Sequence, residues 1–268
     1  MIDNVKKSVV SLILCGLFVI SFLFLADNAY LSPERTKIKF ASERKSFKCG
    51  RKLKDAGKSI LVTGGAGFIG MHTSIKLQKQ GYNVVVIDNL NPYYSKKLKS
   101  DRVKLLQEAN VNFIKGDVCD VKLLEDVFQR HSIDRVVHLA AQAGVRYSLE
   151  DPYSYTKNNV DCFVSVLEAI VKAGLHDKPF VYASSSSVYG FIDKNVPSVE
   201  DEQDVDHPAS LYAATKRADE LIAHTYNNLY NLPSVGIRFF TVYGAYGRPD
   251  MSPMIFADKI VNGGECRT

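Results

Sequence analysis

The sequence predicts an α/β fold, a doubly wound parallel sheet with helices on both faces. Two observations carry this prediction. From Lys58 onward, short apolar runs rich in strand-forming residues alternate with longer helical patterns. The short runs are also almost continuously apolar, which is typical of strands buried on both faces. The length of 268 residues suits one large domain or one and a half.

The expected strands and helices alternate along the chain without an internal repeat. The strands are expected at residues 59–63, 83–88, 111–115, 134–140, 179–184 and 234–240. The helices are expected at about 67–80, 95–108, 120–130, 153–173 and 210–230. Because strand–helix–strand crossovers are right-handed, this order winds the sheet in both directions from its centre.

An uncharged, apolar segment precedes this pattern, at residues 9–26. It just reaches the length that a helix needs to span a bilayer. We therefore expect a membrane anchor in residues 1–26, followed by a basic linker over 27–57 and the globular domain over 58–264. A cleaved signal peptide is the alternative, but the apolar run is long for one and the residues after it make a poor cleavage site.

The charge around the anchor predicts its orientation. More lysine and arginine residues follow the apolar segment than precede it, so the positive-inside rule places the globular part in the cytoplasm. A eukaryotic type II Golgi protein would place it in the lumen instead. The net charge of +5 is mild, and no nucleic-acid-binding module is present, so a nucleic-acid partner is not expected.

The five cysteines are scattered and include no Cys-x-x-Cys pair. This pattern argues against a disulfide framework and against a zinc site, and no metal is expected. We interpret the cysteines as small apolar fillers or free thiols.

A glycine pattern follows the first strand and opens the first helix, with Gly64, Gly67 and Gly70 three residues apart. Gly64 permits the tight turn, Gly67 lets the backbone approach a pyrophosphate, and Gly70 lets the helix pack close to the sheet. The helix N-terminus supplies amide donors for the anion. The turn, with Phe68 and Ile69 between the last two glycines, is a predicted dinucleotide site.

Asp88 ends the second strand, 18 residues after Gly70. A carboxylate there accepts both ribose hydroxyls and repels a 2′-phosphate, so NAD is expected rather than NADP. The alternative for Asp88 is a residue that forms the turn at the strand end. Asn89, which follows it, is also expected to bind the cofactor.

The ends of the third and fourth strands complete the predicted cofactor site. Asp117 is expected to bind the adenine amino group and Val118 to flank the ring, although Asp117 also suits an N-cap or a turn. Small and apolar residues after the fourth strand allow the cofactor to lie against the strand end; they are Leu139, Ala140 and Ala141.

The chemistry of the site is predicted by Tyr212 and Lys216, which lie four residues apart on one face of a helix. An ammonium group beside a phenol lowers the phenol pKa, and the phenolate then accepts a proton. The Tyr-x-x-x-Lys pattern alone also fits a half-buried tyrosine and a solvated lysine. The serine run at 184–187 follows the fifth strand and adds hydroxyl groups, with a polar loop as its alternative.

Four stretches of the chain resemble nucleotide-sugar epimerases of the extended short-chain dehydrogenase/reductase family, and most of all UDP-glucuronate 4-epimerases. They are residues 140–152, 182–190, 206–216 and 237–251. The resemblance implies a Rossmann-type fold, bound NAD, a UDP-sugar substrate and a homodimer.

The resemblance also implies a role for each catalytic residue. Ser185 would hydrogen-bond the oxygen at C4 of the sugar, and Tyr212 would act as general base and acid. Lys216 would bind the nicotinamide ribose and lower the tyrosine pKa. Asn159 matches an asparagine that holds the backbone conformation in the family.

The residues after Ser185 narrow the expected reaction to NAD-dependent 4-epimerisation by transient oxidation at C4. Related dehydratases and decarboxylases carry carboxylates where this chain has Ser186 and Ser187. Arg248 is the expected partner of a uronate carboxylate, because a guanidinium group and a carboxylate match as a bidentate pair. Thr241 and the two serines are expected to donate hydrogen bonds to the same group. The alternative for Arg248 is a surface turn residue.

Family members continue beyond the position that matches Gly264, into a region that binds the nucleotide. We therefore expect most of a C-terminal substrate domain to be absent from this chain. Two further functions stay open: a weak or silent NAD-binding module that acts as a partner subunit, and an epimerase for another UDP-hexose.

Overall fold

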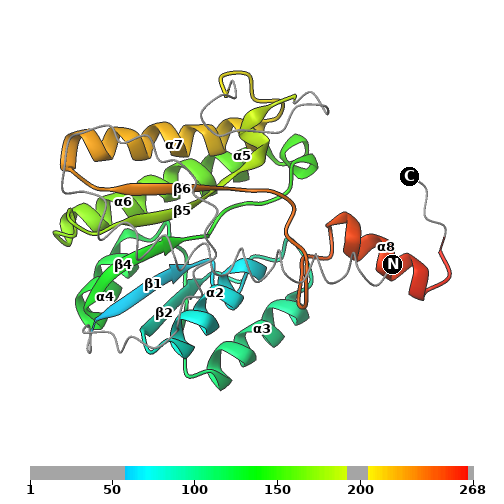
Figure 1. The fold of residues 1–268 in the computed structure, drawn as a ribbon, viewed down its shortest axis with the longest axis horizontal. Coiled ribbons are helices and arrows are strands. Elements are labelled where there is room, and N and C mark those ends of the chain that lie inside the picture. The colour runs from blue at the N-terminus through cyan, green and yellow to red at the C-terminus, as the bar shows by residue number, and fades with distance from the viewer. Residues whose placement is uncertain (1–57, 192–204, 265–268) are drawn as a thin grey trace, which may run out of the picture.

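The computed structural model describes residues 58–191 and 205–264. Within them, six parallel strands form one sheet in the order β3-β2-β1-β4-β5-β6 (Figure 1). The strands are β1 (Ser59–Thr63), β2 (Asn83–Asp88), β3 (Asn112–Lys115), β4 (Ile133–His138), β5 (Phe180–Ser185) and β6 (Ser234–Phe239). This order reverses between β1 and β4, so the doubly wound sheet predicted from the sequence is confirmed.

The helices follow the strands as expected, with some additions. They are α2 (Phe68–Lys79), α3 (Lys96–Glu108), α4 (Val121–His131), α5 (Pro152–Tyr155), α6 (Cys162–Lys172), α7 (Leu211–Tyr230) and α8 (Ser252–Val261). A π-helical segment, η2 (Thr156–Asp161), joins α5 to α6, so the helix predicted over 153–173 is continuous but bulged. The sequence analysis missed α8 and two short helical turns, η1 (Arg146–Leu149) and η3 (Ser186–Tyr189).

Side-chain capping fixes where several of the helices begin. Ser95, Asp120 and Ser210 each accept a hydrogen bond from a backbone amide in the first turn of α3, α4 and α7, respectively. α2 is different, because Gly67 precedes it and no side chain caps it. Its first amides are therefore available to a ligand.

Helices cover both faces of the sheet (Figure 1), and a hydrophobic cluster lies on each face. Because side chains alternate along a strand, Ile60 and Val62 pack with α2 and α3 on one face, while Leu61 packs with α4 and α6 on the other. The second cluster contains an aromatic group around Phe163, whose ring lies 5.2 Å from the Tyr182 ring between centroids. The sheet is thus a rigid support for the loops at its carboxyl edge.

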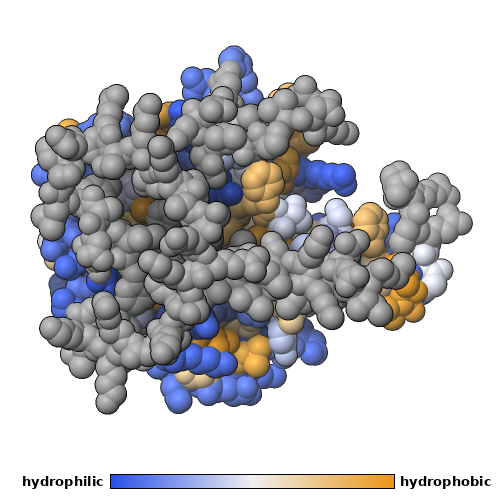
Figure 2. Space-filling view, in the orientation of Figure 1, coloured by the Kyte–Doolittle hydropathy of each residue, from blue (hydrophilic) through white to orange (hydrophobic). Residues whose placement is uncertain are grey.

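The last two elements, β6 and α8, are more exposed to solvent than the elements at the centre of the sheet. None of the residues of α8 is buried, and Ile260 and Val261 are 71% and 82% exposed. Figure 2 shows hydrophobic surface over α8, at the right of the view. β6, at the edge of the sheet, is only partly buried.

The predicted anchor at 1–26 and linker at 27–57 lie outside the described residues and stay predictions. Among residues 58–191 and 205–264, no helix is both long and apolar enough to cross a membrane.

Two of the five cysteines are paired, which corrects the sequence interpretation. Cys119 and Cys162 form a disulfide that links the segment before α4 to the start of α6, with the Cα atoms 4.4 Å apart. The pair is separated by 43 residues, and no spacing motif reveals it. Asp117 lies beside the two sulfurs, but both sulfurs are in the disulfide and offer no thiolate to a metal.

The aromatic group in the core leads to a stability prediction. Phe163→Ala removes a fully buried ring that contacts His138, Phe180 and Tyr182. We expect the free energy of unfolding in urea to fall by about 3–5 kcal/mol, because a cavity is left in the core. Phe191, 94% exposed, is the matched control, and its alanine variant should change the free energy by less than ~0.5 kcal/mol. Equal effects of the two variants would contradict this account of the core.

Candidate functional site

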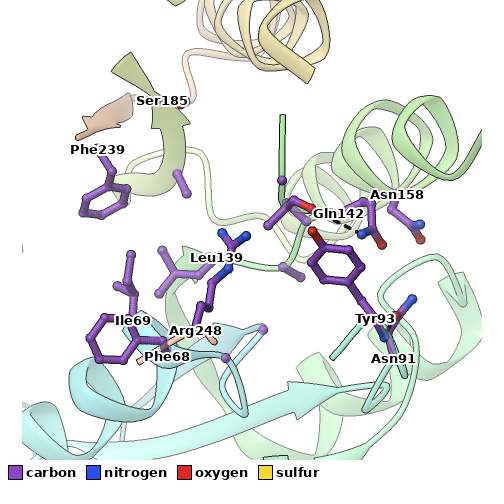
Figure 3. Close-up of a pocket in the computed structure, with 18 of the residues that line it drawn as sticks. Phe68, Ile69, Asn91, Tyr93, Leu139, Gln142, Asn158, Ser185, Phe239 and Arg248 are labelled. Carbon is purple, nitrogen blue, oxygen red and sulfur yellow. Dashed lines mark hydrogen bonds between the residues drawn. The ribbon is translucent and has the colours of Figure 1, made fainter. Parts of the chain in front are cut away.

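A cleft of about 360 Å³ opens at the carboxyl edge of the sheet, across the point where the strand order reverses (Figure 3). The structure brings every predicted site residue to its wall. These residues are Gly64, Gly67, Phe68, Ile69, Gly70, Asp88, Asn89, Asp117, Val118, Leu139, Ala140, Ala141, Ser185, Ser186, Ser187, Tyr212, Lys216, Thr241 and Arg248. Their placement is a finding, while the role of each stays a prediction.

The backbone of the glycine turn lies so close to neighbouring backbone that a side chain at Gly64 or Gly70 would not fit. Gly64 has φ +68°, and a Cβ there would lie 2.6 Å from the amide nitrogen of Ala140. A Cβ on Gly70 would lie 2.2 Å from the carbonyl oxygen of Gly64. The turn therefore presents bare backbone and the uncapped N-terminus of α2 to the cleft. The first turn of α2 carries no acidic residue, so the surface fits a pyrophosphate.

Asp88 is fixed against the glycine turn. Its carboxylate accepts hydrogen bonds from the amides of Ala66, at 3.0 Å, and Leu90, at 2.8 Å. The carboxylate therefore stabilises the turn at the end of β2, which is the alternative role considered for Asp88. It also lines the cleft, as binding to a ribose would require. The carboxylate keeps further acceptor positions for ribose hydroxyls.

Asp117 takes the turn role that the sequence left open. Its side chain accepts a hydrogen bond from the amide of Cys119 at 2.9 Å and another from Asn89 at 3.2 Å. The N-cap of α4 is Asp120 instead. Asp117 and Val118 nevertheless line the same cleft as Asp88, and the adenine role stays a prediction.

The serine run divides into two parts. The Ser184 hydroxyl donates to Glu220 at 2.6 Å and is thereby held toward α7. Ser185 ends β5, and its hydroxyl accepts a hydrogen bond from the amide of Ser187 at 3.2 Å, which starts the η3 turn. The serine run is therefore not simply a polar loop, because Ser185 is the last residue of β5. Its hydroxyl proton can still be donated to a ligand.

Tyr212 and Lys216 both come from α7. The Tyr212 ring packs edge-on against the Tyr155 ring, 6.1 Å between centroids. Lys216 is buried, and its ammonium donates to Asp219 at 3.0 Å. Asp219 is fully buried, and its other oxygen accepts no hydrogen bond from the described residues. Burial raises the pKa of Asp219 to about 6, although the ammonium of Lys216 opposes that rise.

Asn159, in the π-helical segment η2, joins the end of the fourth strand to α7 by hydrogen bonds. The Asn159 side chain accepts from the amide of Gln142 at 2.7 Å and donates to the Gln142 carbonyl at 3.2 Å. It also donates to the hydroxyl of Thr215, beside Lys216, at 3.0 Å. These bonds agree with the conformation-holding role expected of Asn159.

Arg248 points into the cleft (Figure 3), but its guanidinium already has a partner. Its Nε donates to one oxygen of Asp250 at 3.1 Å, and Nη2 donates to the other at 2.5 Å. Tyr93 donates to the same carboxylate at 3.2 Å. Burial lowers the pKa of Arg248, but the hydrogen bonds and charge of Asp250 outweigh it and raise the pKa. The side chain is thus more than a surface turn residue.

Sequence reasoning missed Tyr93, Asp219 and Asp250. The spacing of Asp219, three residues after Lys216 on one helix, does place it on the same side and could have revealed the ion pair. Tyr93 and Asp250 are 157 residues apart, and no local pattern links them.

With this geometry established, comparison with known proteins identifies the family. Residues 60–267 match the NAD dependent epimerase/dehydratase family. The chain belongs to this family. The predicted family resemblance is thereby confirmed.

Curated relatives and solved structures agree on the family. UDP-glucuronate 4-epimerase 1 of Arabidopsis thaliana is 50% identical over 210 residues, which are 78% of this chain and 48% of the relative. UDP-glucuronate 4-epimerase 5 of the same plant is 44% identical over 261 residues, 92% of this chain and 59% of the relative. The chain therefore spans about half the length of the curated relatives it matches.

Among solved structures, UDP-glucuronic acid 4-epimerase from Bacillus cereus, in complex with UDP-glucuronic acid and NAD, superposes with a TM-score of 0.69 at 34% identity. The match covers 77% of this chain and 64% of that one. UDP-glucose 4-epimerase from Thermus thermophilus, in complex with NAD, gives a TM-score of 0.67 at 32% identity, with 78% and 64% covered. These values support the doubly wound fold independently of the site.

His138, behind the cleft, leads to a pH prediction. Its ring is fully buried against Thr63, and burial together with the nearby Lys216 charge lowers the pKa to about 3. The unfolded chain takes up the proton near pH 6.5, whereas the folded chain resists it. Stability is therefore lost as the pH falls below 6.5, by about 2 kcal/mol at pH 5 relative to pH 7.5.

The matched variant is His138→Asn, whose amide preserves a hydrogen bond to Thr63 and does not titrate. Urea unfolding at the two pH values should give the variant a pH dependence about 2 kcal/mol smaller than that of the wild type. Identical pH dependence of the two proteins would show that His138 does not carry this effect.

Proposed function

We propose that this protein catalyses the NAD-dependent 4-epimerisation of UDP-glucuronate to UDP-galacturonate. One observation carries the proposal: Ser185, Tyr212 and Lys216 line the same cleft as the bare glycine turn, so a sugar can lie against both. The relatives named above support the choice of UDP-glucuronate. Because the chain spans only part of the length of these relatives, the proposed activity is argued from the residues that line its own cleft.

The glycine turn, Asp88 and the strand ends would hold NAD. This fit rests on two features, the space that any Cβ at Gly64 or Gly70 would fill and the acid-free N-terminus of α2. Bound NAD supplies the hydride acceptor and donor for C4 of the sugar. Asp88 would accept ribose hydroxyls and repel an added phosphate.

The proton chemistry belongs to the chain itself. Tyr212 takes the proton from the 4-hydroxyl and returns it to the same oxygen in the product of opposite configuration, acting as base and then as acid. Ser185 donates a hydrogen bond to the C4 oxygen and so stabilises the charge that develops there. With only hydroxyls at Ser186 and Ser187, the run supplies no carboxylate for elimination or decarboxylation.

Arg248 is the proposed partner of the uronate carboxylate. The fork of its guanidinium is engaged with Asp250, so the substrate carboxylate must share or displace that partner. Thr241, Ser186 and Ser187 lie in the wall of the same cleft and would donate further hydrogen bonds.

Homodimer formation also stays part of this proposal. Leu221 and Leu229 on α7 are 53% and 67% exposed, which supports a helix face that a second copy covers.

The proposed reaction is tested with the purified chain and UDP-glucuronate, without added NAD. Formation of UDP-galacturonate, measured by chromatography, is expected, and Tyr212→Phe should lower its rate by about 100-fold or more because the general base is lost. Tyr230→Phe, on the same helix but remote from the cleft, is the matched control and should leave the rate unchanged.

Three results would contradict the proposal. Full activity of Tyr212→Phe would mean that the base is another residue. No turnover by the wild type, with NAD still bound, would instead favour the silent NAD-binding module. Conversion of UDP-glucose but not of UDP-glucuronate would point to another UDP-hexose.

The pairing of Arg248 with Asp250 gives a separate prediction. Asp250→Asn keeps the shape of the side chain but removes a carboxylate that competes with the substrate. Calorimetric titration should show UDP-glucuronate binding about fivefold tighter, which corresponds to ~1 kcal/mol. UDP-glucose, which has no carboxylate, serves as the control ligand and should bind unchanged. Weaker binding of UDP-glucuronate would show that Asp250 aims Arg248 rather than competing for it.

A further inference from the structure

Arg102 is a fully buried cation on α3, and the described residues give it no carboxylate partner. Its guanidinium donates instead to backbone carbonyls and to one hydroxyl. Nε and Nη2 donate to the carbonyl of Tyr246 at 3.1 and 2.8 Å, and Nη2 also reaches the carbonyl of Gly247 at 3.3 Å. Nη1 donates to the carbonyl of Ala66 at 3.0 Å and to the hydroxyl of Tyr94.

These carbonyls belong to two loops that the sequence separates widely. Ala66 lies in the glycine turn, and its own amide donates to Asp88. Tyr246 and Gly247 lie in the loop after β6, immediately before Arg248. One side chain therefore ties the predicted cofactor turn to the segment that carries the predicted uronate partner.

The loop at 244–247 needs an external support. It is a tight turn closed by a bond from the amide of Gly247 to the carbonyl of Gly244, at 2.9 Å, and Tyr246 holds an unfavourable positive φ of 58°. The turn directs three successive carbonyls toward the first half of the domain. Arg102 binds two of them, and His72 on α2 donates to the third, that of Ala245, at 2.9 Å.

We propose that Arg102 is a positioning residue that sets the place of Arg248 and thereby determines selectivity for a uronate. The inference deepens the proposed function and rests on it. Fixing the backbone of Tyr246 and Gly247 fixes the point from which the next side chain enters the cleft. A planar guanidinium holds several carbonyls in one fixed arrangement through a rigid fork of N–H donors, whereas a lysine ammonium is a compact charge on a flexible stem.

The test compares Arg102→Met and Arg102→Lys with the wild-type chain. Calorimetric titration with UDP-glucuronate and UDP-glucose measures the preference for the carboxylate. Both variants should lose between about tenfold and about 100-fold in affinity for UDP-glucuronate, as expected when a binding group is displaced by about 1 Å. Affinity for UDP-glucose should stay within about threefold, because that sugar does not use Arg248. Lys104→Met, which removes an exposed cation from the same helix, is the matched control and should behave as wild type.

Two further measurements separate positioning from a general loss of structure. Added to Arg248→Met, the Arg102→Met change should have no further effect on UDP-glucuronate affinity, because both act through one group. Hydrogen exchange followed by mass spectrometry should show faster exchange in the Arg102 variants at the loop after β6, with the strands still protected.

The outcomes are distinct. Unchanged exchange in that loop and an unchanged preference would overturn the proposal. An equal loss of affinity for UDP-glucuronate and UDP-glucose, accompanied by global unfolding in both Arg102 variants, would also overturn the proposal. Arg102 would then contribute to stability alone. If the wild type shows no preference for UDP-glucuronate, the uronate part of the proposed function fails, and the exchange result alone decides whether Arg102 positions the loop.

Discussion

Backbone lies directly against backbone at the centre of the sheet, and this close approach governs the geometry of the whole site. The turn after β1 lies so near the end of β4 that a Cβ at Gly64 would meet the amide of Ala140. This contact lies where the strand order reverses and the two halves of the sheet diverge. The N-terminus of α2 is bare because Gly67 precedes it, and residues of both halves of the sheet line the floor of the cleft.

Charged side chains around this floor are held before any ligand arrives. Lys216 is paired with Asp219, Arg248 with Asp250, and Asp88 with the backbone of the glycine turn. Buried charges need such partners because an isolated ion in the protein interior is costly. The partners also fix side-chain positions, so a ligand loses less free energy to ordering the site.

Much of the fold was predictable because local sequence patterns indicate strands, helices and turns directly. Apolar strands such as 83–88 and the glycine turn at 64–70 agree with the structure, since burial on both faces and the turn geometry each demand particular residues. α8 was missed, and none of its residues is buried in the part of the chain that the structure describes. The disulfide was missed because its cysteines meet only when α4 packs against α6.

Local amino-acid patterns were enough to predict the sheet, the glycine turn and the Tyr212–Lys216 pair, and the family resemblance added Ser185, Thr241 and Arg248 to the predicted site. These follow from short stretches of chain, in which spacing along a strand or helix decides which side chains share a face. The hydrogen bonds and ion pairs that hold those residues in place were visible only in the tertiary structure. The contacts of Arg102 with Tyr246, and of Tyr93 with Asp250, join positions more than a hundred residues apart. Such contacts depend on how loops meet above the sheet, and no local pattern encodes that meeting.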